Sequence, residues 1–234
     1  MPGKTPLNDA ENIKQRIASA PLFHGLSEES IQQLASHAIA RKHPRGQLIL
    51  LENDWGGAVY LIFEGWVKIR TYNLDGKEVT LNIVGNNEVV GEMAVLEEAP
   101  RSTDVITLTE TTVCSIPAND FKQVLYSEPT ASIHLAQSMA KRLRQINRRL
   151  QLREADSQTR VVDTLLFIGE EQGKEGDKGI EIPNLPHREL SSMSGLARET
   201  VTRTLNKLED KKLIERQATI LRILDLQALQ KIIG

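Results

Sequence analysis

The feature that most constrains the fold of this sequence is a change of hydrophobic spacing at Pro117. Before it, from Ala40 to Ile116, short apolar runs are separated by turn-forming Gly, Asn and Asp residues. After it, apolar residues recur at helical spacing as far as about Glu154. Repeated short strands with tight turns favour a closed antiparallel sheet, so the first segment predicts a β-barrel or β-roll. The second predicts a long helix over about residues 118–154.

The segment before the strands also has helical spacing. Between residues 13 and 38 its apolar positions are Ile17, Leu22, Phe23, Ile31 and Leu34. Ser27, followed by Glu28 and Glu29, has the pattern of a helix N-cap with an acidic first turn. Short helices are therefore expected here, after a loose polar tail at residues 1–12.

A chain of 234 residues is long enough for two domains, each with its own core. Beyond the long helix, Asp156 or Ser157 can cap a new helix that runs to about Gly169. A polar, charged loop is expected after that helix. We therefore predict an α+β protein with a first domain at residues 13–154 and a second at residues 155–234.

Within the second domain, residues 186–208 have the pattern of two helices joined at Gly195. The apolar positions that would be buried are Leu190 and Met193 on the first helix and Val201, Leu205 and Leu208 on the second. Gly195 supplies the tight turn between them, which gives a helix-turn-helix. Two short apolar runs follow, LIER and TILRIL, and they predict a β-wing.

Four residues at the start of the second helix are not needed for packing: Arg198, Glu199, Thr202 and Arg203. Their spacing places them on one exposed face. Arginine donates a fork of hydrogen bonds to guanine, and glutamate accepts one from cytosine. The charges alone would equally suit a solvated helix surface. Together with the glycine-centred turn and the wing, they predict binding in the major groove of double-stranded DNA.

The long helix carries a seam of apolar residues spaced alternately by three and four. Its members are Ala136, Met139, Leu143, Ile146 and Leu150. The flanking positions are basic: Lys141, Arg142, Arg144, Arg148 and Arg149. Because the charged faces are unsuited to burial, the seam predicts pairing with a second copy and hence a homodimer. The alternative is that the seam packs on the β domain.

The segment GEMAVLEEAPRS, Gly91–Ser102, has the makings of an anion site. A turn at Gly91 that runs into a short helix presents unpaired N–H groups. Arg101 can add a bidentate cation and Ser102 a hydroxyl. Glu92 would repel a phosphate, but it suits a sugar hydroxyl next to one. The segment therefore predicts a nucleotide monophosphate site, with a structural Glu92–Arg101 ion pair as the alternative.

Composition narrows the function further. With 29 Lys+Arg and 31 Asp+Glu the formal charge is −2, so DNA must be met by a local basic surface. No apolar run approaches the ~18 residues of a membrane span and the N-terminus is polar, so a cytoplasmic protein without membrane contact is expected. Cys114 is the single cysteine, expected as a small buried hydrophobe, and no metal cluster is predicted. No nucleophile and base occur together, so no enzyme is predicted.

These motifs resemble those of the CRP/FNR (cyclic AMP receptor) family of transcription regulators, over about residues 20–230. GEMAVLEEAPRS is similar to the family's phosphate-binding cassette and MAKRLRQINRRL to its dimerisation helix. LARETVTRTLNKLEDKKLI is similar to its recognition helix and wing. The resemblance implies a cyclic-nucleotide-binding β-roll, a long dimerisation helix and a C-terminal winged helix-turn-helix.

The resemblance also implies roles for residues of the cassette. Glu92 would hold the ribose 2′-hydroxyl, and Arg101 and Ser102 would hold the cyclic phosphate. Gly91 and Met93 would supply the backbone of the loop.

On the long helix, the resemblance places Arg142 near the phosphate or ribose, and Ile146 and Asn147 near the base. The best-known cyclic AMP members have two adjacent hydroxyl residues at the last two positions, and here the chain departs from them. Ile146 has no hydrogen-bonding group, whereas Asn147 can satisfy either the adenine amino group or the guanine carbonyl. Cyclic AMP is the expected effector. Cyclic GMP, a cyclic dinucleotide, a small oxo acid and no effector at all are the alternatives.

The resemblance finally implies an allosteric homodimer that works with RNA polymerase. Arg198, Glu199 and Arg203 would read a palindromic, TGTGA-like DNA site.

Overall fold

The computed structural model describes residues 9–233. The chain forms two compact units. One comprises Met1–Thr71 and Asn82–Lys141, and the other comprises Tyr72–Leu81 and Arg142–Gly234. The predicted boundary at residues 154 and 155 stays a prediction.

The first unit begins with three short helices: α1 (Ala10–Ser19), the 3-10 helix η1 (Pro21–Phe23) and α2 (Glu28–Ser36). Ser27 caps α2, since its side chain accepts from the Ser30 N–H at 3.3 Å, and Glu28 and Glu29 form the acidic first turn. The predicted N-cap is thus confirmed. The first helix starts at Ala10, because Asp9 caps it by accepting from the Glu11 N–H. The predicted loose tail is therefore wrong for residues 10–12, and its residues 1–8 lie outside the described residues.

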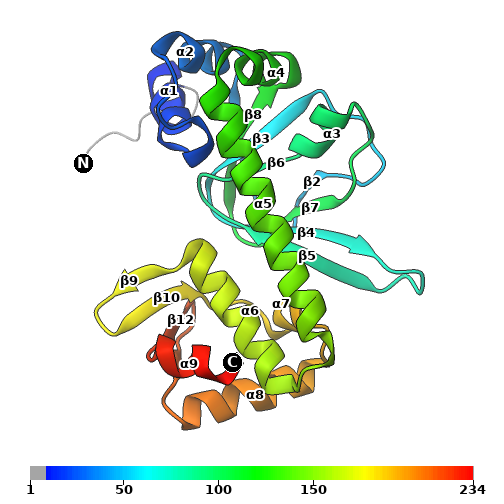
Figure 1. Ribbon diagram of the computed structural model, residues 1–234, viewed down its shortest axis with the longest axis vertical. Coiled ribbons are helices and arrows are strands. Elements are labelled where there is room, and N and C mark those ends of the chain that lie inside the picture. The colour runs from blue at the N-terminus through cyan, green and yellow to red at the C-terminus, as the bar shows by residue number, and fades with distance from the viewer. Residues whose placement is uncertain (1–8, 234) are drawn as a thin grey trace. The chain divides into compact units, whose positions relative to one another are not determined.

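Two four-stranded antiparallel sheets, which lie mostly within this unit, form its body (Figure 1). One sheet has the order β1 (Ile39–His43), β8 (Thr111–Pro117), β3 (Ala58–Glu64) and β6 (Val89–Val90). The other has the order β2 (Leu48–Leu50), β7 (Asp104–Thr107), β4 (Val67–Tyr72) and β5 (Glu78–Val84). Both sheets contribute to one apolar cluster of Leu50, Ile62, Val67, Val84, Val90, Val105 and Val113. The predicted antiparallel β domain is confirmed.

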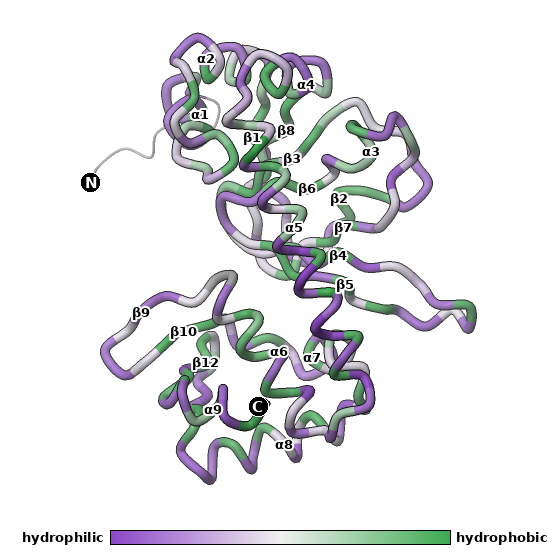
Figure 2. The backbone as a smooth tube through the Cα atoms, in the orientation of Figure 1, coloured by the Kyte–Doolittle hydropathy of each residue, from purple (hydrophilic) through white to green (hydrophobic). Residues whose placement is uncertain are grey.

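A second apolar cluster lies where α1, α2 and α4 (Ala118–Ser127) pack at one end of the sheets (Figure 1). Phe23 meets Phe121 edge-on there, and Cys114 is fully buried among these residues. Figure 2 shows hydrophobic residues along β3 and β8, whose side chains line this core. The expectation that Cys114 acts as a buried hydrophobe on a strand is confirmed.

The predicted single helix over residues 118–154 is wrong in one respect, because the structure breaks it at Glu128. Helix α4 ends at Ser127, and a separate helix α5 (Pro129–Gln151) follows, with a 3-10 turn η2 at Leu152–Glu154. Glu128 has φ −120° and ψ 92°, outside the helical region. Pro129 explains the break, since a proline disfavours helical geometry in the residue before it and lacks an N–H to continue the ladder.

In the second unit, Asp156 caps helix α6 (Ser157–Gln172) by accepting from the Gln158 and Thr159 N–H groups, as predicted. The helix extends past the expected end at Gly169. The polar segment after it is a hairpin and not a loop: β9 (Lys174–Gly176) pairs with β10 (Gly179–Pro183). Strand β9 contains Lys174, Glu175 and Gly176 and no apolar side chain, and Figure 2 shows its first part as hydrophilic, which is why apolar spacing did not reveal a strand there.

The remaining elements are α7 (His187–Ser194), α8 (Arg198–Asp210), β11 (Ile214–Arg216), β12 (Ile220–Ile223) and α9 (Leu226–Ile233). Strands β9 to β12 form one antiparallel sheet in the order β11-β12-β10-β9. The expected wing is therefore present as β11 and β12. The core of the unit forms between α6, α8 and the sheet, from residues that include Val161, Leu165, Ile168, Val201, Leu205, Leu221 and Ile223.

Candidate functional site

The loop from Gly91 to Ser102 opens with a turn at Gly91 that runs into a short helix, as the sequence predicted, and the turn residue is left-handed. Gly91 has φ 82° and stands at the N-cap of the short helix α3 (Glu92–Glu97). A Cβ at this position would lie 2.7 Å from Nη1 of Arg101. Two features therefore favour glycine at this position: the left-handed backbone angle and the close approach of the Arg101 guanidinium.

Arg101, at the other end of the loop, is buried with only 4 % of its surface exposed. Its Nη1 donates to the Gly91 carbonyl at 2.6 Å, and its Nη2 donates to the Ala58 carbonyl at 2.7 Å. These bonds use two of the five N–H donors of a guanidinium. Three donors therefore remain for an anionic ligand.

The electrostatics of this arginine favour an anion. Burial lowers the pKa of Arg101, and Tyr60 and Glu92 act in the opposite direction through their charges. Glu92 is itself buried, as the first residue of α3. Because desolvation makes an incompletely paired cation costly, binding of a negative group at this position is favourable.

The other cassette residues are more exposed. Met93 lies on the open side of α3, and Ser102 is exposed next to Arg101. Arg142, Ile146 and Asn147 belong to α5 in the second unit, where Ile146 and Asn147 are exposed. Their part in effector binding stays a prediction.

One part of the arginine's surroundings was missed by sequence reasoning. The segment from Asn53 to Ala58 wraps around Arg101: the Arg101 N–H donates to the Asp54 carbonyl at 2.8 Å, and the Asn53 N–H donates to the Arg101 carbonyl at 2.8 Å. In the sequence, this glycine-containing stretch indicated only a turn between strands. The two adjacent glycines, Gly56 and Gly57, are equally typical of a turn, so they gave no signal for the contact with Arg101.

The helix-turn-helix in the second unit has the predicted geometry. Gly195 lies between α7 and α8 with φ 65°, in the left-handed region that favours glycine. The five predicted core positions are all buried: Leu190, Met193, Val201, Leu205 and Leu208. Arg160 of α6 fixes the turn, since its guanidinium donates to the Ser194 carbonyl at 2.6 and 3.0 Å and to the Gly195 carbonyl at 3.2 Å.

On the predicted reading face of α8, Arg198, Glu199 and Arg203 are exposed. Thr202 is different, because it is half-buried and hydrogen-bonded within the protein. Its hydroxyl donates to the Arg198 carbonyl at 3.0 Å, so it accepts from Nδ1–H of His187 at 2.7 Å. Thr202 thus joins the start of α7 to the reading face.

The wing is tied to α8 by an ion pair. Arg216 of β11 donates through Nε and Nη2 to Oε2 of Glu209, at 3.0 and 2.5 Å. This bonding lowers the pKa of the Glu209 carboxyl. The pair fixes β11 against α8, so the basic residues of the wing and of the helix keep one geometry.

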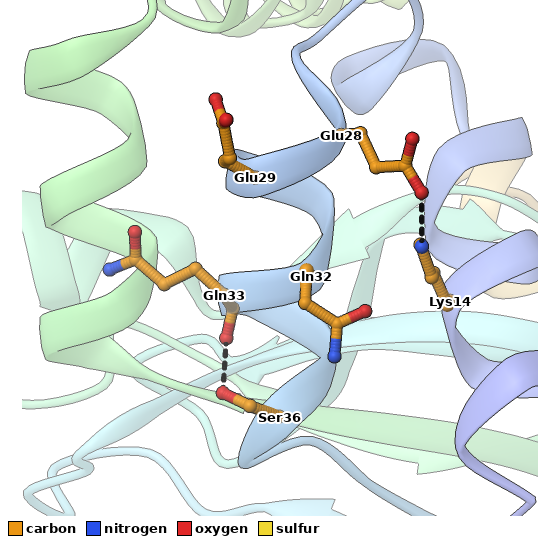
Figure 3. A pocket seen from close by; sticks show the side chains of 6 residues that line it. All are labelled: Lys14, Glu28, Glu29, Gln32, Gln33 and Ser36. Atoms are coloured by element: carbon orange, nitrogen blue, oxygen red, sulfur yellow. Dashed lines mark hydrogen bonds and ion pairs between the residues drawn. The ribbon is translucent and has the colours of Figure 1, made fainter.

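A separate polar hollow lies between α1 and α2 (Figure 3). It is lined by Lys14, Glu28, Glu29, Gln32, Gln33 and Ser36. Its cation is already paired, since Nζ of Lys14 lies 2.7 Å from the Glu28 carboxylate. No cluster of metal-ligating side chains occurs within the described part of the chain. Nor is any helix between residues 9 and 233 long and apolar enough to cross a membrane.

A β-roll with a buried arginine that keeps N–H donors available, together with a winged helix-turn-helix, defines the class of ligand-responsive DNA-binding regulators. Comparisons with known proteins agree with this class. Residues 40–128 match the model of the cyclic nucleotide-binding domain, and residues 159–232 match that of the Crp-like helix-turn-helix domain.

The cyclic AMP receptor protein of Thermus thermophilus is 30% identical over 200 residues, which cover 85% of this chain and 89% of that protein. A CRP-like cAMP-activated global transcriptional regulator of Mycobacterium tuberculosis is 29% identical, with 81% and 85% covered. The chain therefore belongs to the CRP/FNR family of transcription regulators. Its fold is also that of the c-di-GMP-responsive regulator CLP of Xanthomonas campestris, with a TM-score of 0.67, 23% identity, and 85% and 100% of the two chains covered.

Proposed function

We propose that this chain is a homodimeric transcription regulator whose DNA binding is controlled by cyclic AMP. The observation that carries the proposal is the buried guanidinium of Arg101, which keeps three N–H donors for an anion next to the carboxylate of Glu92. A cyclic nucleotide offers both matching groups, a phosphate for the cation and a ribose hydroxyl for the carboxylate.

Cyclic AMP is favoured by the relatives from Thermus and Mycobacterium, both of which carry cyclic AMP in their names. In this proposal Ser102 assists Arg101 at the phosphate, and Arg142, Ile146 and Asn147 complete the site. A cyclic dinucleotide is the second candidate, since the structurally similar Xanthomonas regulator is described as responsive to c-di-GMP.

The homodimer rests on the apolar seam of α5. Met139, Leu143, Ile146 and Leu150 are between 38 and 62 % exposed, which is unusual for four large apolar side chains in one row. The seam has coiled-coil spacing, so a second α5 is the partner that covers it most completely. Two copies would present two α8 helices to a palindromic, TGTGA-like site, with RNA polymerase as the further partner.

The deciding experiment is isothermal titration of the full chain with cyclic AMP, cyclic GMP and c-di-GMP. It is followed by fluorescence anisotropy on palindromic DNA, with and without the ligand that binds most tightly. We expect cyclic AMP to bind and to increase DNA affinity. If no cyclic nucleotide binds, and DNA binding is the same throughout, the effector assignment is wrong. If c-di-GMP alone acts, the second candidate replaces the first.

A further inference from the structure

The surroundings of Arg101 contain two glycines that differ in one respect. A Cβ at Gly56 would lie 2.0 Å from Nη2 and 2.5 Å from Cζ of Arg101, whereas a Cβ at Gly57 would meet nothing within 4 Å. Neither glycine has a φ in the left-handed region. The backbone therefore tolerates alanine at both positions, and only the contact with Arg101 separates them.

From this contrast we infer that Gly56 is a positioning residue for the anion-binding guanidinium. Because it lacks a side chain, it gives Nη2 the space to reach the Ala58 carbonyl at 2.7 Å. Gly91 gives Nη1 the same access to its own carbonyl on the other side. The inference rests on the proposed function, in which Arg101 binds the effector's phosphate.

The position of the guanidinium matters because of how its donors divide. While Nη1 and Nη2 are each bonded to a main-chain carbonyl, the plane of the group is fixed, and its three remaining N–H groups point in fixed directions. A side chain at residue 56 occupies the place of Nη2, so the guanidinium must swing away and lose the Ala58 carbonyl. An arginine that is no longer oriented pays more conformational entropy on binding an anion.

The substitution is not expected to disrupt the fold. The atom that a Cβ at residue 56 would strike is the far end of a flexible side chain, which moves more easily than backbone. We therefore expect Gly56→Ala to give a folded protein that binds cyclic AMP about 10- to 100-fold more weakly, the range set by one hydrogen bond to a charged group. Gly57→Ala, the matched control, should bind like the wild type.

The test is titration of the full chain with cyclic AMP for the wild type, Gly56→Ala and Gly57→Ala, with thermal unfolding of each to verify the fold. The same pair is repeated with Arg101→Lys, because a shorter ammonium does not occupy the place beside residue 56. Gly56→Ala should then have little further effect on affinity, and this non-additivity identifies an effect that acts through Arg101.

The outcomes distinguish the positioning role of Gly56 from the proposed binding of a cyclic nucleotide. Equal affinity of Gly56→Ala and Gly57→Ala, tighter binding by Gly56→Ala, or a full loss in the Arg101→Lys background would each overturn the positioning role and leave the proposed function intact. Failure of the wild type and of Gly57→Ala to bind any cyclic nucleotide would overturn the proposed function, and this inference with it.

Discussion

The β-roll and the helix-turn-helix both depend on arginine, but they hold it in opposite ways. Arg101 is buried, and the main-chain carbonyls of Gly91 and Ala58 fix its guanidinium. Arg198 and Arg203 stand exposed on the first two turns of α8. Arg203 has one long hydrogen bond, 3.4 Å from its Nη2 to the Thr200 hydroxyl.

Under the proposed function, this difference corresponds to the size of the anion that each region would meet. A small ligand is bound from within, so orientation before binding improves both affinity and selectivity. A DNA duplex is met on a surface, where long side chains adjust to phosphates and base edges, and the helix as a whole sets the register. We expect the largest effect for substitution of the buried arginine and smaller effects for changes elsewhere.

The largest effect is expected for Arg101→Leu. It removes the cation and the three N–H donors that are not bonded to main-chain carbonyls, so the affinity for cyclic AMP should fall on the order of 100-fold or more, since hydrogen bonds to charged groups contribute about 1.5–3 kcal/mol each. Calorimetric titration measures this loss. Arg198→Leu is the control, an exposed arginine whose removal should leave effector binding unchanged. Normal nucleotide affinity in Arg101→Leu would mean that Arg101 does not bind the effector's phosphate.

A smaller and different effect is expected for Glu199→Ala on the exposed face. Loss of one base contact should weaken binding to the cognate site by about 1–3 kcal/mol and relax the preference at one base pair. A binding-site selection with both proteins measures this, and cyclic AMP affinity serves as the control. Unchanged base discrimination would mean that Glu199 does not read the DNA.

The third prediction concerns how the stability of the folded chain depends on pH through His187, which is hydrogen-bonded to Thr202 on the predicted reading face. Burial, together with the charges of Arg216 and Arg198, lowers the pKa of His187. Below the unfolded-state pKa, about 6.5, the unfolded chain takes up a proton at this residue more readily than the folded one, so stability is lost as the pH falls. Denaturant unfolding of the full chain between pH 7.5 and pH 5 measures this trend.

His187→Gln provides the control for that measurement. Glutamine keeps a donor for Thr202 but cannot titrate, so its stability should depend less on pH in this range. An equal pH dependence in the two proteins would show that His187 contributes nothing to it.

The smallest effect is expected at Cys114 in the core of the roll. Burial raises the pKa of its thiol to about 12, so almost no thiolate is present near neutral pH. Iodoacetamide should leave the native protein unmodified at pH 8 and label it fully in denaturant, as mass spectrometry would show. Rapid labelling of the native chain would mean that the core of the roll opens often enough to expose Cys114 to the reagent.

The sequence-based prediction was correct for features that depend on a few neighbouring residues, such as helix caps and turns. The cap at Asp156, the turn at Gly195 and the buried face of α8 each follow from a few neighbouring residues, and all were predictable. The break at Pro129 was missed because helical spacing continues on both sides of it. The strand β9 was missed because it contains Lys174, Glu175 and Gly176 and no apolar side chain.

The candidate site could be predicted only in part, for a different reason. The residues of the loop Gly91–Ser102 are contiguous, so they could be grouped into one candidate site from the sequence. The partner of Nη2 on Arg101 is the carbonyl of Ala58, 43 residues away along the chain. A main-chain carbonyl carries no sequence signal, and a glycine that makes room for a distant side chain has the same letter as one that makes a turn.

Arg160 connects three helices of the second unit through its hydrogen bonds to the turn between α7 and α8. Its hydrogen bonds to the Ser194 and Gly195 carbonyls link the first turn of α6 to the point about which the DNA-reading helix would pivot. Helix α6 also packs directly against α7 and α8. The orientation of α8 within this unit is therefore set by α6 in two ways, through the Arg160 hydrogen bonds at the turn and through helix packing.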